Sequence, residues 1–171
     1  MLSEKMKNLL NAQVALEAQS SQAYLAMASW AEIQPGLDGV TAFFYQHSDE
    51  ERMHMLKLIK FINERGGFAT IPALSQPVLT FKSLKHAFEA LLEHEVHVSA
   101  SINDLVDEAL QEKDFATYNF LQWYVAEQIE EEQLARKLND KLEMIGDDKG
   151  GLYLFDRDIM MMGNAGGGAN K

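Results

Sequence analysis

Glu51 and His54 are the two residues of this chain whose types and spacing most strongly suggest chemistry. They lie three residues apart in a segment whose apolar pattern predicts a helix, so their side chains share one helix face. A carboxylate and an imidazole are costly to bury without a partner, and a buried Glu-x-x-His pair therefore favours a bound metal ion. Four-helix bundles hold pairs of metal ions with this motif. The same spacing also occurs on solvated helix faces, so the prediction depends on ligands from other helices.

Three further carboxylates lie near the middle of the other predicted helices, at Glu17, Glu95 and Glu131. Mid-helix residues meet at one level of a bundle, whichever way each helix runs. Four buried carboxylates would take up protons or destabilise the fold unless cations neutralise them, and two divalent ions supply four positive charges. The sequence therefore predicts a two-metal site in which Glu51 and His54 join these three residues. For each glutamate taken singly, a solvated face is the alternative.

A second acidic group lies beside this site on the fourth predicted helix. Glu127, Glu130 and Glu131 stand at positions i, i+3 and i+4 and share a face, where like charges destabilise a helix by roughly 0.2–0.5 kcal/mol per pair. Glu50 is rotated about 100° from Glu51 around the second helix, so it could face this group at a neighbouring third metal position. A plain solvated acidic run is the alternative.

Composition narrows both the ligand chemistry and the class of partner. The 171 residues include no Cys, so disulfides and thiolate metal sites are excluded and the hard ligands that suit iron or manganese remain. A net charge of −11 without a Lys/Arg cluster argues against nucleic-acid binding and favours solubility or attraction of cations. No segment approaches the roughly 20 apolar residues of a membrane span, and the N-terminus lacks a signal-peptide pattern. We therefore expect no membrane partner and a cytoplasmic location.

Hydrophobic periodicity predicts four long helices, over residues of about 3–33, 39–65, 81–111 and 115–145. Ser3 and Thr80 are the expected N-caps of the first and third helices. The first helix is expected to point one stripe inward: Met6, Leu9, Leu10, Val14, Ala18, Ser21 and Leu25. Short connections make helices one and two antiparallel, and likewise three and four. The connection 66–81 has about 14 residues and could span roughly 45 Å, enough to cross the length of the bundle.

A fifth apolar segment, Leu152–Met162, has no slot in a four-helix core. We expect its apolar residues to be buried against other subunits, with a helix folded back on its own bundle as the alternative. Residues 1–163 are expected to form one domain, and residues 164–171 a flexible Gly-rich tail.

Over residues 1–163 the chain resembles the bacterial non-haem ferritins. The elements that carry the resemblance are Glu17 with Tyr24, Glu50-Glu51-x-x-His54, Glu93-His94-Glu95 and the run from Asn119 to Glu132, NFLQWYVAEQIEEE. The resemblance implies an all-α, ferritin-like four-helix bundle with a long crossover between helices two and three and a short fifth helix. It also implies iron storage with ferroxidase activity: Fe(II) is oxidised by dioxygen or hydrogen peroxide, and a ferric mineral is deposited inside a shell of 24 identical subunits, with the fifth helix at its four-fold axes.

The resemblance further implies roles for individual residues. Glu17, Glu51 and His54 would form iron site A, and Glu51 would bridge to site B, which Glu95 and Glu131 complete. The resemblance places Gln128 beside the pair and implies a third iron site with the ligands Glu50, Glu127, Glu130 and Glu131. Tyr24 would donate an electron or a hydrogen bond at the pair. Trp123 would be a core residue first and an electron donor second. Core packing is the alternative for Tyr24.

Two positions depart from the haem-containing bacterioferritins. That relative carries a second Glu-x-x-His on helix four, where this chain has Gln128 and Glu131. Its haem-ligating Met directly follows the bridging Glu, where this chain has Arg52. We therefore expect no haem. Bridging through Glu51 alone predicts a labile site B, so the two irons per subunit should pass through the centre rather than remain as a fixed cofactor.

Two other functions fit the same bundle. A permanent diiron oxidoreductase, such as a rubrerythrin-like peroxidase, usually adds a Cys-ligated iron domain, and the absence of Cys argues against it. A mini-ferritin-like DNA-protecting protein places its ligands at a subunit interface and lacks a fifth helix after helix four.

Overall fold

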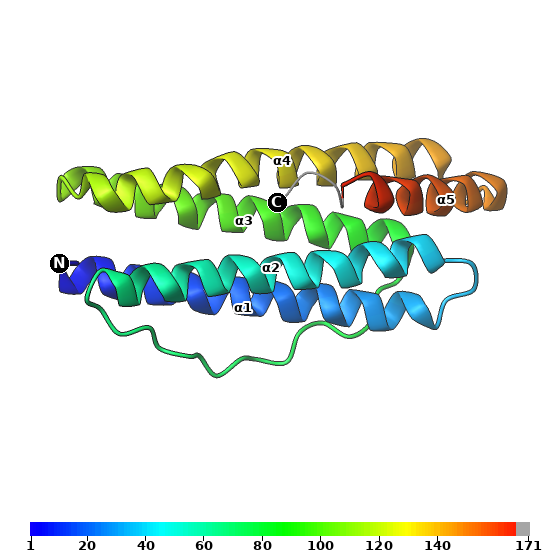
Figure 1. Cartoon of the computed structure of the whole chain (residues 1–171). Helices are drawn as coiled ribbons and strands as arrows, with labels where there is room; N and C mark the ends of the chain where they lie inside the picture. Colours follow the sequence, from blue (N-terminus) through cyan, green and yellow to red (C-terminus); the bar gives the residue numbers. More distant parts are fainter. Residues whose placement is uncertain (167–171) are drawn as a thin grey trace.

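The computed structural model describes residues 1–166, with side chains up to residue 162, and these residues form five α-helices. They are α1 (Glu4–Glu32), α2 (Asp38–Glu64), α3 (Leu84–Gln111), α4 (Phe115–Ile145) and α5 (Lys149–Gly166). Figure 1 shows α1 to α4 as an elongated bundle, with the α2–α3 connection running along its outside from one end to the other. The predicted all-α bundle with one long crossover and a fifth helix is confirmed. Among the described residues, no helix combines the length and apolar character needed to cross a membrane.

The helix starts follow from capping side chains. The hydroxyl of Ser3 accepts a hydrogen bond from the Met6 amide at 3.0 Å, as expected for an N-cap. The prediction that the third helix starts near Phe81 with Thr80 as its N-cap is wrong. Ser83 caps α3 instead, accepting from the His86 amide at 3.1 Å. The reason is that Phe81 is buried within the crossover, before the helix begins.

The apolar core consists of two clusters that lie at different levels of the bundle. One includes Met6, Leu10, Val14, Leu58 and Val98, and the other includes Tyr24, Phe44, Leu91 and Ala135. On each of the four long helices, the predicted metal ligands fall between the residues of the two clusters. The predicted inward stripe on α1 is correct except at two positions: Leu9 is half-buried and Leu25 is 40% exposed. Leu25 is exposed because the neighbouring Tyr24 occupies the inward position.

Helix α5 folds back onto its own bundle. Phe155 and Ile159 are buried in the core, and the Phe155 ring meets the Phe88 ring edge-on at 5.6 Å. For this face of α5, the expectation of burial against other subunits is wrong and the folded-back alternative holds. The opposite face keeps Tyr153 and Met161 exposed. The helix extends to Gly166, into the expected tail, whose residues 167–171 lie outside the described part of the chain.

A carboxylate of α5 caps α2. The N-cap residue of α2, Leu37, makes no capping hydrogen bond through its side chain. Instead, buried Asp156 accepts from the backbone amides of Gly39 at 3.0 Å and Val40 at 2.8 Å. A Cβ at Gly39 would lie 2.1 Å from the Asp156 carbonyl oxygen, so glycine is required for this close approach. This contact fixes α5 to the start of α2.

We expect Asp156→Ala to destabilise the protein by about 1–2 kcal/mol, because two helix N-terminal amides lose their acceptor. Hydrogen exchange should show faster exchange at Gly39 and Val40. Asp158→Ala, on the same helix but outside this contact, is the matched control and should leave both amides protected. Unchanged protection in Asp156→Ala would contradict the role of this cap.

Candidate metal centre

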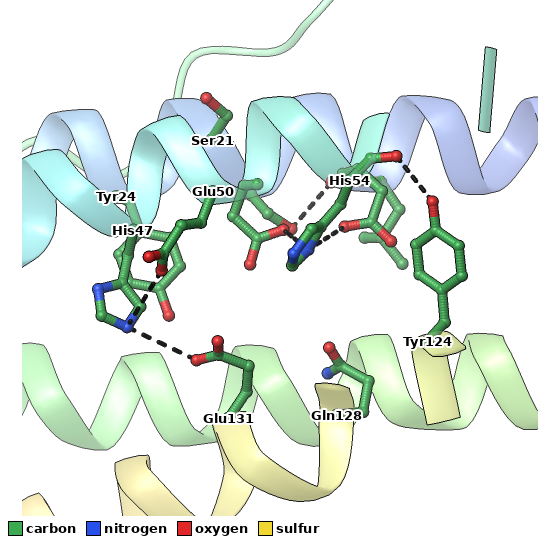
Figure 2. A network of polar contacts seen from close by, with 12 residues as sticks. Ser21, Tyr24, His47, Glu50, His54, Tyr124, Gln128 and Glu131 are labelled. Carbon is green, nitrogen blue, oxygen red and sulfur yellow. Dashed lines mark hydrogen bonds and ion pairs between the residues drawn. The ribbon is translucent and has the colours of Figure 1, made fainter. Parts of the chain in front are cut away.

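Most of the predicted ligands gather in the gap between the two apolar clusters (Figure 2). Glu17, Glu51, His54 and Glu95 are each at most 6% exposed, although three of them are carboxylates. They come from α1, α2 and α3, and Gln128 and Glu131 approach from α4. The expectation that mid-helix positions of all four long helices meet at one level therefore describes the structure.

Glu17, Glu51 and His54 form a compact group that could hold a metal ion. His54 Nδ1 lies 3.5 Å from Glu51 Oε2 and 3.9 Å from Glu17 Oε2. Ligand atoms bound to one ion at about 2.1 Å lie roughly 3.0–3.8 Å from one another, so an ion fits with little movement. Glu17 Oε2 and Glu51 Oε2 are also buried without a hydrogen-bond partner, which is rare in native proteins. An ion between these atoms would satisfy both.

The electrostatics of the site favour a cation. Burial raises the pKa of Glu17 well above its usual range, and the neighbouring Glu51 carboxylate raises it further. Burial likewise raises the pKa of Glu51 and of Glu131 to about 8, with the charge of Glu95 adding to both. Each shift disfavours the charged form of the carboxyl group, so a cation bound among these groups would stabilise that form.

Glu95 is held by hydrogen bonds at both carboxylate oxygens. Tyr24 donates its hydroxyl to Oε1 at 2.8 Å, and Gln128 Nε2 donates to Oε2 at 3.2 Å. Tyr24 therefore bonds a predicted ligand, as expected, and its buried ring also packs 6.3 Å from that of Phe44, as the core-packing alternative requires. Gln128 is buried and lies beside Glu95; its role at a metal pair stays an expectation from the resemblance.

The predicted third position is assembled differently. Of its four expected residues, Glu50 and Glu131 come together, but they do so with His47, whose Nε2 lies 3.8 Å and 3.7 Å from their carboxylates. Glu127 is half-buried and Glu130 is exposed, and neither belongs to this compact group. Both line the same groove between α2 and α4, of about 990 Å³. A third site with all four carboxylates stays a prediction.

Two residues of the site were missed from the sequence. Gln13 is fully buried and donates to Glu17 Oε1 at 2.7 Å, while Ser101 donates to Gln13 at 2.6 Å. His47 is the other. Gln13 precedes Glu17 by four residues and His47 precedes Glu51 by four, so each shares a helix face with a ligand. That spacing is the signal that could have identified them.

Trp123 lies beside this centre and makes an aromatic contact and a cation–π contact. Its ring meets the His54 ring edge-on at 5.2 Å, and Lys57 Nζ lies 3.8 Å from its centroid. The Tyr124 hydroxyl donates to the His54 carbonyl at 2.8 Å, which ties α4 to α2 at the level of the ligands. These contacts hold the His54 backbone and ring in place.

Comparison with known proteins identifies the family. The family model of the ferritin-like domain matches residues 7–145. A probable bacterial non-heme ferritin-like protein of Haemophilus influenzae and a bacterial non-heme ferritin of Campylobacter jejuni are each 45% identical over 159 residues, covering 93% of this chain and at least 95% of theirs. A structure of an open pore ferritin from Archaeoglobus fulgidus superposes with a TM-score of 0.91 at 45% identity, over 94% of this chain and 99% of that one. The chain therefore belongs to the ferritin family.

Proposed function

We propose that this protein stores iron and is a ferroxidase, with Fe(II) as its substrate at the centre formed by Glu17, Glu51, His54, Glu95 and Glu131. The observation that carries the proposal is the pair of buried carboxylate oxygens, on Glu17 and Glu51, that face His54 without any hydrogen-bond partner. Such an arrangement is stable only with a proton or a cation between the atoms. Relatives described as bacterial non-heme ferritins support iron as that cation and the absence of haem.

The proposed reaction needs two Fe(II) ions per subunit. Each ion gives up one electron, and dioxygen with two protons becomes hydrogen peroxide; when hydrogen peroxide is the oxidant, the two electrons and two protons yield two waters. We infer that Glu51 would contact both ions, because its Oε2 lies 3.5 Å from His54 Nδ1 and the charges of Glu95 and Glu131 raise its pKa. The apolar clusters above and below exclude bulk water, which strengthens electrostatic interactions inside the site. The Fe(III) product then leaves for the interior of the assembly and grows as mineral.

Passage of iron through the site follows from its ligands. Gln128 stands where a second charged ligand could be, and its amide bonds Glu95. We infer that Glu51 alone would bridge the two ions and that the ion on the Glu95/Glu131 side would be weakly held. A permanently metallated oxidoreductase would instead keep both metals during chelation and form no mineral.

We further propose assembly into a shell of 24 subunits. The exposed apolar residues on the outer face of α5, among them Tyr153, Leu154 and Met161, need a partner surface. The solved relatives include an open pore ferritin. A shell of 24 subunits of 19.3 kDa would have a mass of about 460 kDa, which light scattering separates from the 12-subunit assembly of the mini-ferritin alternative.

Anomalous diffraction at the iron edge tests the proposed site directly. Crystals soaked anaerobically in Fe(II) should give peaks between Glu17, Glu51 and His54 and between Glu51, Glu95 and Glu131. Admission of air to the same protein in solution, at a large excess of Fe(II), should give a soluble ferric core that co-elutes with the assembly. Iron found only at surface carboxylates, or ferric precipitate outside the protein, would overturn the proposal.

A further inference from the structure

A second cavity, the α1–α3 pocket, lies between α1, α3 and the crossover that runs along α1 (Figure 1). Its volume is about 300 Å³, and among the described residues it shares no lining residue with the groove between α2 and α4. Most of its lining is apolar, with Ala23 and Met27 from α1, Leu91 from α3 and Phe81 from the crossover. Such a lining favours an apolar ligand, because the transfer of apolar surface out of water is favourable.

The polar residues of the α1–α3 pocket are mostly engaged within the protein. Gln19 donates to the Ser75 carbonyl at 3.3 Å and accepts from the Ser75 hydroxyl at 3.1 Å. His94 Nε2 pairs with the Ser20 hydroxyl at 2.6 Å. Gln76 belongs to the exposed part of the crossover. A polar ligand would have to break these hydrogen bonds to form its own, so the pocket is better suited to an uncharged apolar molecule.

Tyr24 connects the α1–α3 pocket to the candidate metal centre. Its side chain lines the pocket, is only 1% exposed, and donates its hydroxyl to Glu95 Oε1 at 2.8 Å. A molecule in the pocket is therefore one side chain away from an expected iron ligand. A diatomic molecule needs only transient side-chain movement to pass Tyr24, whereas a hydrated ion needs a continuous polar path.

The two cavities beside the centre differ in the reactant that each suits. The groove between α2 and α4 is lined by carboxylates, among them Glu50, Glu127 and Glu130, and so suits cations. Of the reactants in the proposed oxidation, only dioxygen is uncharged and apolar. Hydrogen peroxide is uncharged as well, but it donates and accepts hydrogen bonds and gains little from an apolar lining.

We propose that the α1–α3 pocket binds dioxygen and supplies it to the paired centre past Tyr24. The inference rests on the proposed function, since the centre uses dioxygen only if it oxidises Fe(II) there. Ala23 and Ala90 line the pocket from α1 and α3 and are half-buried. A larger side chain at either position should fill the pocket without altering an expected metal ligand.

Xenon tests the pocket without iron, because this apolar atom binds in dry apolar cavities. Crystals of the metal-free protein under xenon pressure should show an anomalous peak between Ala23, Met27 and Leu91. Ala23→Leu should lose this peak, and Ala90→Leu fills the pocket from α3 as a second variant. Ala12→Leu and Ala100→Leu are the matched controls at exposed positions on the same two helices, and both should keep the peak.

Stopped-flow oxidation of Fe(II) at varied dioxygen concentration tests the supply. Ala23→Leu should raise the dioxygen concentration for half-maximal rate by about threefold or more with the maximal rate unchanged, because lost binding of a substrate appears in KM. With hydrogen peroxide as the oxidant, its rate should equal that of Ala12→Leu. Such a result would locate the effect in the delivery of dioxygen and leave the iron ligands intact.

Two results would overturn the proposal. One is the absence of xenon from the pocket of the unaltered protein. The other is loss of the xenon peak in Ala23→Leu or Ala90→Leu while the dioxygen dependence stays that of the matched control. Failure of the unaltered protein to oxidise Fe(II) rapidly with either oxidant would instead count against the proposed function.

Discussion

Replacing Glu51 and His54 together by alanine is expected to slow the fast phase of Fe(II) oxidation by about 100-fold or more. In the proposed centre, Glu51 would face both iron positions, and His54 would be the nitrogen ligand of one of them. Loss of about 3 kcal/mol of metal-ion positioning corresponds to roughly this factor in rate. The measurement is stopped-flow absorbance after aerobic mixing of the metal-free protein with two Fe(II) per subunit.

The matched control for this variant is Glu93→Ala with His97→Ala. It removes the same two residue types from exposed positions on α3, and the fast phase should survive. Circular dichroism and light scattering on both variants check that the fold and the assembly are intact. A fast phase of unchanged rate in Glu51→Ala with His54→Ala would show that oxidation takes place elsewhere.

The metal-free protein is expected to lose stability as pH rises from about 5 to 8. The folded-state pKa values of Glu51 and Glu131 are raised to about 8 by burial, whereas in the unfolded chain these groups titrate near 4.3. Between these limits the folded state binds more protons than the unfolded state. Unfolding free energy therefore falls as pH rises through this range. Calorimetric Tm at a fixed protein concentration checks this.

Two additions make the pH experiment specific to the site. Zn(II) should raise Tm most at pH 8, because the ion neutralises carboxylates that are otherwise charged and buried. Glu131→Gln should flatten the pH dependence, since an amide does not titrate, while Asp140→Asn, at an exposed position on the same helix, should not. A Tm that rises between pH 5 and 8 in the metal-free protein would contradict the assignment.

The clustering of the ligands was predictable because the apolar helical repeat is interrupted by a polar residue at a similar level in each of the four helices. Apolar residues repeat at helical spacing on both sides of Glu17, Glu51, Glu95 and Glu131, and each polar interruption falls near mid-helix. Any antiparallel or parallel pairing of such helices brings their centres to one level. The crossover was predictable for a similar reason, since its length matches that of a helix. The start of α3 was not, because Thr80 and Ser83 are both acceptable caps and burial of Phe81 decides between them.

His47 illustrates what spacing alone leaves open. Its position four residues before Glu51 puts it on the ligand face, but the same spacing suits a core histidine. Only the packed structure brings Glu131 of α4 opposite its Nε2 and the Phe43 carbonyl against its Nδ1. The predicted third site named Glu127 and Glu130 because their spacing on α4 is regular, but in the structure Glu127 is half-buried and Glu130 is exposed.

By itself, the sequence determined the helices, the crossover and the level at which the carboxylates meet, because these depend on residues within one or two helical turns. Tertiary structure alone decided how α5 is placed and which groups surround each ligand. Asp156 reaches the start of α2 across 117 residues of chain, and no local pattern encodes that contact. It forms because burying Phe155 and Ile159 brings this carboxylate to amides that have no other acceptor. The candidate metal centre has the same origin: helical periodicity supplies the expected ligands, and packing of the two apolar clusters brings them together.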